Sequence, residues 1–504
     1  MSGRAESFSI RTYGCQMNVH DSDKVANLLH HAGLSRCETE SSADLLVINT
    51  CSIRDKAEQQ LYSDLGRLRD WKSERPGRIL GVGGCVAQQV GDTILKRFSH
   101  VDFVFGTHNI RLVPAMVASA EAGQRSLQVA ESRSHERFDL PAPHPDQQSP
   151  TPGRAFLTVM EGCDMFCSFC IVPRTRGREI SRPASEVIRE AEQLVSVGVR
   201  EITLLGQTVN AYGRHDVRRG QGDAAGTVPF AELLSRLDRI PGLERIRYTS
   251  PHPAFFEPSL VRAHGELEAL CPHVHLPLQS GCDTVLERMR RRYTRAEYLA
   301  IAAGLRQARP DLVLTTDAIV GFPGESDADF GETLSVFREA GFVDSYLFKY
   351  SPRPDTPAAE MTGEVAGGEA QERLQALQAL QHELTLEYHR GRVGDQTEIL
   401  LEGPSRASRA SRADETHAQL RDAPVQMCGR DPYRRVVNVS LPSGSSWRVG
   451  TLAPVEIVEA TPHSLIGQVA GQADDSAPEL ALGRAGAATG VPLQLRSISD
   501  RQEM

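Results

Sequence analysis

Short apolar runs alternate with amphipathic stretches along the first 125 residues or so, a pattern typical of a parallel α/β sheet. The amphipathic stretches predict helices, as at Asp23–His31 and Ala57–Trp71. The apolar runs predict strands at Phe8–Thr12, Leu45–Asn49, Arg78–Val82 and Val101–Phe105. We therefore expect an open parallel α/β domain over residues 6–125.

A second α/β run follows a stretch rich in Pro, Ser, Gln and His that has no periodicity and predicts a linker, placed at 126–153. The predicted strands are Phe156–Met160, Glu201–Leu205, Arg245–Thr249, His273–Pro277, Val313–Val320 and Ser345–Lys349. From Ser185 the apolar positions recur on one helical face. Six β/α units over residues 154–390 fit a partial barrel better than a closed eight-fold one.

The end of the chain changes character again. A helical stretch at about 368–390 leads into a Val-, Ile- and Thr-rich segment broken by Gly, Pro and Ser, which predicts a small all-β barrel over 391–470. Residues 471–504 are rich in Ala, Gly, Asp and Ser and predict a disordered tail.

Composition indicates the cell compartment and the role of the cysteines. The chain has no apolar run of eighteen residues, so we expect no membrane span, and its polar start has no secretory character. We expect a cytoplasmic protein, in which ten cysteines are better suited to metal binding or catalysis than to disulfides. The net charge of −9 means that an RNA partner must be met by local basic surface.

Three distant cysteines fall at equivalent places. Cys15, Cys51 and Cys85 are separated by 35 and 33 intervening residues, and each follows one of the first three predicted strands. Ligands of open parallel sheets bind beyond the carboxyl ends of the strands. These thiols can therefore converge on one point.

A second triad is local. Residues 162–170, GCDMFCSFC, place Cys163, Cys167 and Cys170 in one loop after a predicted strand. Three thiolates in one loop can hold three irons of a cubane cluster and leave the fourth iron open to a ligand. Zinc is the alternative, but it usually needs a fourth nearby Cys or His, and none stands at the expected offset.

CxxxCxxC after the first strand of a partial barrel resembles the radical S-adenosylmethionine superfamily. That resemblance implies that S-adenosylmethionine binds the open iron and is cleaved reductively to a 5′-deoxyadenosyl radical, with Phe169 against the adenine. The strand end 319–325, IVGFPGE, supplies glycines for close approach to a ligand, although a plain strand-to-helix turn is equally compatible. The expected cofactor-binding residues are Phe169, Gln279, Ser280, Gly321, Gly324 and Glu325.

Further motifs narrow the resemblance. Residues 12–18 (TYGCQMN), 49–51 (NTC), 84–88 (GCVAQ), 248–253 (YTSPHP), 276–281 (LPLQSG) and 350–354 (YSPRP) resemble the methylthiotransferase family over about 6–470, in particular its branch acting on N6-isopentenyladenosine in tRNA. The resemblance implies a second 4Fe–4S cluster on Cys15, Cys51 and Cys85, where sulfur is held and methylated by one S-adenosylmethionine. The radical then removes the hydrogen from C2 of the adenine at position 37, which becomes methylthiolated.

The same resemblance implies partners and a final domain. It implies the anticodon stem-loop of tRNA as substrate, electron-donor and sulfur-donor proteins, no membrane, and a monomer. The β-rich segment looks like the TRAM domain of this family, a barrel that binds RNA, and Arg430, Arg434 and Arg435 there suit phosphate contacts or a solvated surface equally well.

Other features stay open. Thr208, Cys282 and Asp355 depart from the family pattern, and we expect none of them to touch a cluster ligand. The other cysteines (Cys37, Cys271, Cys282 and Cys428) and the histidines at 252, 273 and 275 are expected to be packing or pocket residues. The basic run at 288–295 fits solvated surface or phosphate contact equally. The arginines at 174–178 fit solvated surface or the entrance to the active site equally.

Alternative functions share the same chemistry. Methylthiolation of threonylcarbamoyl-adenosine in tRNA, or of a ribosomal-protein aspartate, would use both cysteine triads. The residues Gln16, Met17 and Asn18 after Cys15 favour isopentenyladenosine by resemblance alone. A catalytically idle iron–sulfur RNA-binding protein is disfavoured because all six cysteines and the glycine-rich loop are present.

Overall fold

The computed structural model describes residues 4–37, 39–52, 55–132, 135–144, 152–222, 226–408, 425–441 and 445–469. The chain divides into two compact units. The first comprises residues 1–150, 171–180 and 481–504, and the second comprises 151–170 and 181–480. The predicted disordered tail lies outside the described residues.

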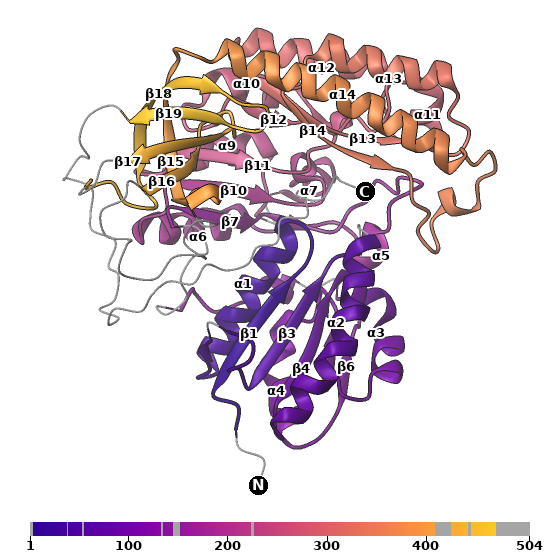
Figure 1. Cartoon of the computed structure of the whole chain (residues 1–504), viewed down its shortest axis with the longest axis vertical. Helices are drawn as coiled ribbons and strands as arrows, with labels where there is room; N and C mark the ends of the chain where they lie inside the picture. Colours follow the sequence, from indigo (N-terminus) through magenta and orange to yellow (C-terminus); the bar gives the residue numbers. More distant parts are fainter. Residues whose placement is uncertain are drawn as a thin grey trace. The chain divides into compact units, whose positions relative to one another are not determined.

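The first unit is built on a six-stranded parallel sheet in the order β2-β1-β3-β4-β5-β6 (Figure 1). Its strands are β1 (Ser7–Thr12), β2 (Ser35–Arg36), β3 (Leu45–Thr50), β4 (Ile79–Gly84), β5 (Phe103–Phe105) and β6 (Ser126–Gln128). The four predicted strands are present. Two short edge strands, β2 and β6, have too few residues to show a period, and β6 carries the sheet past the expected boundary at residue 125.

Helices cover both faces of this sheet. α1 (Gln16–His31) and α4 (Val113–Glu121) pack on one face, and α2 (Asp55–Glu74) and α3 (Cys85–Arg97) pack on the other. The two apolar cores explain why β3 and β4 are buried along their whole length. The helix α1 begins seven residues before its predicted start, because its polar first turns contain the residues that follow Cys15.

The second unit contains six parallel strands. β7 (Arg154–Thr158), β10 (Glu201–Leu205) and β11 (Arg245–Tyr248) form one sheet, and β12 (His273–His275), β13 (Val313–Val320) and β14 (Asp344–Lys349) form another. A bridge between Ile246 and Leu270 connects the edges β11 and β12. The result is the predicted partial barrel, whose large apolar core is shared with the surrounding helices.

Helices and minor elements complete this barrel. They are β8 (Met160–Glu161), β9 (Ile180–Ser181), α6 (Ala184–Ser196), α7 (Arg214–Arg218), α9 (Phe230–Leu237), α10 (Pro258–Glu266), α11 (Asp283–Arg288), α12 (Arg295–Ala308), α13 (Asp327–Ala340) and α14 (Gly367–Gly391). None of the helices in the described part of the chain combines the length and apolarity that crossing a membrane would need.

The last elements form a closed five-stranded barrel in the order β15-β16-β17-β19-β18. These strands are β15 (Gln396–Pro404), β16 (Val425–Arg430), β17 (Val436–Leu441), β18 (Leu452–Ala460) and β19 (Leu465–Val469). The predicted small all-β domain is therefore confirmed. Its interior is a compact apolar cluster.

Arginines fasten this small barrel to the rest of the second unit. Arg245 donates to the carbonyls of Glu398 and Arg430 at 2.7 and 3.0 Å. Arg435 donates to the Asp344 carboxylate at 3.0 Å, and Arg430 pairs with Glu402. Two of the three arginines proposed from sequence for phosphate contact, Arg430 and Arg435, thus already have protein partners.

Candidate active site

The first cysteine triad lies at the carboxyl ends of three neighbouring strands. Cys15 caps α1 just after β1, Cys51 follows β3, and Cys85 is the first residue of α3 after β4. Gly14, at φ +130°, makes the approach feasible, because a Cβ there would lie 2.4 Å from the Cβ of Cys51. The three cysteines therefore lie at the same edge of the sheet, as the parallel sheet predicted from sequence requires.

Polar groups around this triad affect the thiols. The Cys15 thiol donates to Oδ1 of Asn18 at 3.3 Å. The hydrogen bond from Cys51 is the largest influence on Cys15 and lowers its pKa to about 6 against the opposing effect of burial. Burial raises the pKa of Cys85, and the charge and hydrogen bond of Arg176 oppose that rise.

Arg176 is a buried cation of the first unit. It comes from the segment 171–180, whose short helix α5 (Val172–Thr175) packs against α3. Its guanidinium donates to Oδ2 of Asp21 at 2.6 Å, and both side chains are almost fully buried. Sequence reasoning treated Arg174–Arg178 as surface or entrance residues, whereas the structure places Arg176 beside the thiols of Cys15 and Cys85.

The second triad lies in the loop after β8. Cys163 and Cys167 are buried and Cys170 is half-buried. Oγ1 of Thr208 lies 3.1 Å from the Cys163 sulfur, and Nη1 of Arg291 donates to the Cys167 sulfur at 3.4 Å. The expectation that Thr208 touches no cluster ligand was wrong, because the turn after β10 brings residue 208 against the loop.

The basic run contributes more than surface charge. The backbone of this run binds Ser168 of the cysteine loop. The Ser168 N–H donates to the Met289 carbonyl at 3.1 Å, and the Ser168 hydroxyl donates to the Arg288 carbonyl at 2.8 Å. Arg288 in turn donates to the carbonyl of Pro323 at 3.0 Å. Arg288 and Arg291 therefore connect the cysteine loop with its surroundings, although Arg288 is exposed, as Arg290 and Arg292 are.

The predicted cofactor-binding residues gather around this loop. The ring of Phe169 lies edge-on to Phe322, with 6.4 Å between centroids. Both rings pack in a small apolar core with Cys282, Val285 and Met289. The glycines at 321 and 324 take positive φ values of 70° and 79°. Phe169 and the glycine-rich loop, 150 residues apart in sequence, thus line one region of the second unit.

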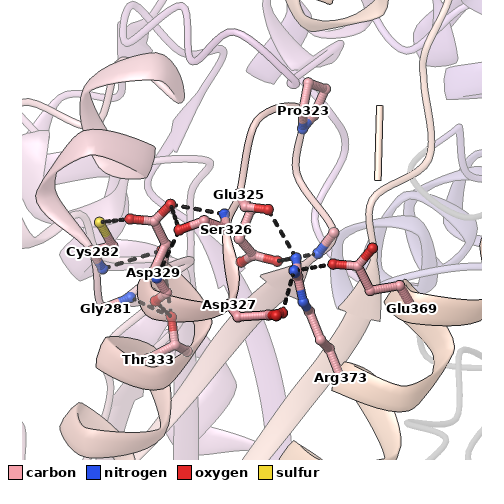
Figure 2. Close-up of polar contacts among 12 residues, drawn as sticks. Gly281, Cys282, Pro323, Glu325, Ser326, Asp327, Asp329, Thr333, Glu369 and Arg373 are labelled. Carbon is pink, nitrogen blue, oxygen red and sulfur yellow. Dashed lines mark hydrogen bonds and ion pairs between the residues drawn. The ribbon is translucent and has the colours of Figure 1, made fainter. Parts of the chain in front are cut away.

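Gln279 and Ser280 lie at the end of the neighbouring strand segment. Gln279 has a φ of 69° and exchanges backbone hydrogen bonds with Asp317 and Ile319 across a bridge to β13. The Ser280 hydroxyl accepts from the N–H of Cys282 at 3.3 Å. The Cys282 thiol donates to Asp329 at 2.8 Å, so this cysteine is engaged locally (Figure 2).

Glu325 has an internal role in its loop. Its side chain is 0% exposed, and Oε2 accepts from the Gly321 N–H at 2.6 Å. The same oxygen accepts from Arg373 at 3.0 Å (Figure 2). Burial raises the pKa of Glu325, and Arg373 opposes that effect. The carboxylate therefore fixes the conformation of the glycine-rich loop, and it would affect a bound cofactor through that conformation.

The three histidines considered from sequence have separate partners. His252 caps a short turn and lies 5.6 Å from the Tyr293 ring. His273 contacts Thr315, and His275 contacts both Thr315 and the Asp317 carboxylate. Their contacts agree with the packing and pocket roles proposed from sequence.

The thiol triads suit iron–sulfur clusters in donor chemistry. Within the described ranges, no group of three or more His, Cys, Asp or Glu side chains is placed to hold a single metal ion. A cubane binds its thiolates at separate corner irons, so its ligands need not meet at one point. Each triad offers three sulfur donors beside a buried arginine, an arrangement that favours thiolates.

Comparisons with known proteins agree with this geometry. Residues 7–106 match the model of an uncharacterized protein family, UPF0004, and residues 157–337 match the radical SAM superfamily. A tRNA-2-methylthio-N(6)-dimethylallyladenosine synthase of Geobacter metallireducens is 46% identical over 92% of this chain and 98% of its own. The corresponding synthase of Jannaschia sp. is 43% identical over 91% and 93%. The chain belongs to this synthase family.

The two family models together match most of the α/β part of the chain. Solved structures are more distant: a radical S-adenosylmethionine methyltransferase, TsrM, of Kitasatospora setae has a TM-score of 0.48 at 12% identity, covering 70% of this chain and 74% of that one. The radical SAM match covers the loop of Cys163, Cys167 and Cys170, and the other match covers Cys15, Cys51 and Cys85. The supporting residues Arg176, Thr208 and Arg291 were missed in the sequence, because each is distant from the cysteine that it contacts.

Proposed function

We propose that this chain is a radical S-adenosylmethionine tRNA methylthiotransferase that converts N6-isopentenyladenosine at position 37 to its 2-methylthio derivative. The observation that carries the proposal is the presence of two complete cysteine triads in a member of the synthase family. We further propose that the anticodon stem-loop is the recognised part of the tRNA, that separate proteins donate electrons and sulfur, and that the enzyme acts as a monomer.

Different residues of the chain would hold the clusters and bind S-adenosylmethionine. When bound, two 4Fe–4S clusters and S-adenosylmethionine supply the 5′-deoxyadenosyl radical, the sulfur and the methyl group. Cys163, Cys167 and Cys170 would hold one cluster, and Cys15, Cys51 and Cys85 the other. Phe169, Gln279, Ser280, Gly321 and Gly324 would bind S-adenosylmethionine, and Glu325 would fix the loop through its bond to the Gly321 N–H.

The substrate is tested by mass spectrometry of nucleosides from total tRNA of cells with and without the gene. Loss of 2-methylthio-N6-isopentenyladenosine, with accumulation of N6-isopentenyladenosine, is the expected result. An unchanged profile of these two nucleosides would refute the substrate assignment. A change in threonylcarbamoyl-adenosine, or in a ribosomal-protein aspartate, would instead indicate a sister reaction.

The two-cluster assignment is tested by iron analysis. Anaerobically reconstituted chain should contain about eight irons, from two cubanes. Replacing Cys15, Cys51 and Cys85 by Ala should leave about four, because only the loop cluster would remain. The matched control replaces Cys37, Cys271 and Cys428 by Ala and should keep the full iron content. An unchanged iron content in the first variant would contradict the second cluster.

A further inference from the structure

Arg291 is in direct contact with a thiol of the loop triad. Its Nη1 donates to the sulfur of Cys167 at 3.4 Å, its Nε to the Tyr293 hydroxyl at 3.1 Å, and its Nη2 to the Pro277 carbonyl at 3.4 Å. The Tyr293 hydroxyl donates onward to the Leu278 carbonyl at 2.6 Å. The guanidinium is therefore held by Tyr293 and Pro277 and has one N–H directed at the Cys167 sulfur.

The charge of Arg291 is buried without an ordinary counter-ion. The residue is 6% exposed, and in the part of the chain that the structure describes no carboxylate forms an ion pair with it. An isolated buried charge is costly unless it is paired. Its electrostatic partners are the Tyr293 hydroxyl first and then the Cys167 sulfur, which would carry negative charge as a cluster ligand.

The backbone is specialised to direct this side chain inward. Arg290 and Arg292, on either side, take φ values of 58° and 37°, in the left-handed region that costs non-glycine residues energy. Both are exposed, whereas Arg291 between them is buried. This turn also supports Ser168 through the Met289 carbonyl, so it holds the cysteine loop by its backbone and by the Arg291 side chain.

The charge also affects its other neighbours. His252 lies against Tyr293, and its pKa is well below the ordinary value because of burial first and then the charges of Arg291 and Arg292. This histidine therefore stays neutral. Arg291 is left as the fixed positive charge next to Cys167.

We propose that Arg291 is a positioning residue of the loop cluster, orienting the Cys167 thiolate and making the cluster easier to reduce. Hydrogen bonds to cluster sulfurs and local charge set cluster potentials. A reduced cluster carries one more negative charge than the oxidised one, so a fixed cation at its ligand stabilises the reduced form. The inference rests on the proposed function only in that a cluster must form on Cys163, Cys167 and Cys170.

The test isolates that cluster in the full chain. In a background with Cys15, Cys51 and Cys85 replaced by Ala, the variants Arg291→Gln and Arg291→Lys are reconstituted anaerobically. Iron content is measured, and the midpoint potential is obtained by a redox titration followed by electron paramagnetic resonance. Arg290→Gln is the matched control, since it removes the same charge from an exposed position in the same turn.

The expected result is a cluster that forms but is harder to reduce. Arg291→Gln should keep about four irons and shift the midpoint to more negative potential. At a fixed solution potential we expect a ratio of reduced to oxidised cluster at least tenfold lower than in the parent. This is equivalent to a midpoint shift of about 59 mV for one electron. Arg291→Lys, which keeps the charge, should recover most of the shift, and Arg290→Gln should behave as the parent.

Each other result has a defined meaning. A loaded Arg291→Gln variant with the parental potential overturns the inference. If Arg291→Gln holds no iron, Arg291→Lys decides: iron at a near-parental potential supports the role of charge, and an iron-free lysine variant overturns it. A parent that itself holds no iron on this loop contradicts the proposed function instead, so the two failures are distinguishable.

Discussion

Replacing Arg373 by Met should loosen the glycine-rich loop that ends β13. Arg373 donates to the carboxylate and to the backbone carbonyl of Glu325, both at 3.0 Å, and it also contacts Asp327 and Glu369 (Figure 2). The Glu325 side chain is 0% exposed, whereas the Asp327 side chain is 93% exposed. Losing the arginine therefore matters at Glu325, because Asp327 stays solvated.

The size of the effect follows from these contacts. Removing one partner of a buried ion pair costs about 3–5 kcal/mol. Glu325 can limit this cost by taking up a proton. Moving the pKa of a carboxyl from its ordinary 4.5 to neutral pH costs about 3 kcal/mol at about 1.4 kcal/mol per unit. If the loop alone opens, a loss of about 2–3 kcal/mol weakens S-adenosylmethionine binding by about 30- to 140-fold.

The assay is equilibrium binding of S-adenosylmethionine to the anaerobically reconstituted protein. The defect of Arg373→Met should shrink as the pH falls from 8 to 6, because the closed loop then binds more protons than the open one. Adding Glu325→Gln should restore most of the affinity by removing the uncompensated charge. Asp327→Asn is the matched control, with binding close to the parent's.

Two results would refute this reasoning. Unchanged affinity in Arg373→Met would mean that the ion pair does not maintain the loop. A double variant that binds no better than Arg373→Met would mean that the buried charge of Glu325 is not the source of the defect.

Two further predictions concern buried charges elsewhere. In a chain lacking the loop cysteines, Arg176→Gln should lower the iron held by the first-unit triad. Asp21→Asn should lower it less, because Arg176 then keeps its positive charge next to the thiols. Equal iron in parent and variants would contradict this. His264, bonded to the Tyr248 hydroxyl at 2.6 Å, has its pKa lowered by burial to about 3 from 6.5, so protons favour the unfolded chain below pH 6.5. Thermal denaturation midpoints should fall from pH 7 to pH 5, and less steeply in His264→Gln; parallel slopes would argue against it.

The strand pattern was predictable because it depends on local physics. Apolar runs such as 45–49 and 313–320 identify buried parallel strands, and parallel strands place their carboxyl ends at one edge. That rule was sufficient to bring Cys15, Cys51 and Cys85 together from sequence. Short edge strands such as β2 and β6 carry too few residues to show any period.

The supporting residues could not be predicted in the same way. Arg291 is 124 residues from Cys167 and Thr208 is 45 residues from Cys163, and no local pattern links either pair. A run of arginines ordinarily indicates a solvated helix face. Only the left-handed turn at Arg290 and Arg292 shows that the middle arginine of the run is directed inward.

The two triads have similar electrostatics although their folds differ. The chain as a whole is acidic, with a net charge of −9, yet a buried arginine acts on a thiol of each triad: Arg176 on Cys85 and Arg291 on Cys167. Three thiolates close together repel one another, and burial makes that repulsion stronger. A buried cation offsets it, but at a cost when the thiols are neutral. Asp21 pairs with Arg176 and offsets that cost, whereas no carboxylate pairs with Arg291 among the described residues. The burial of Arg291 is therefore best compensated when a cluster is bound to the Cys167 sulfur.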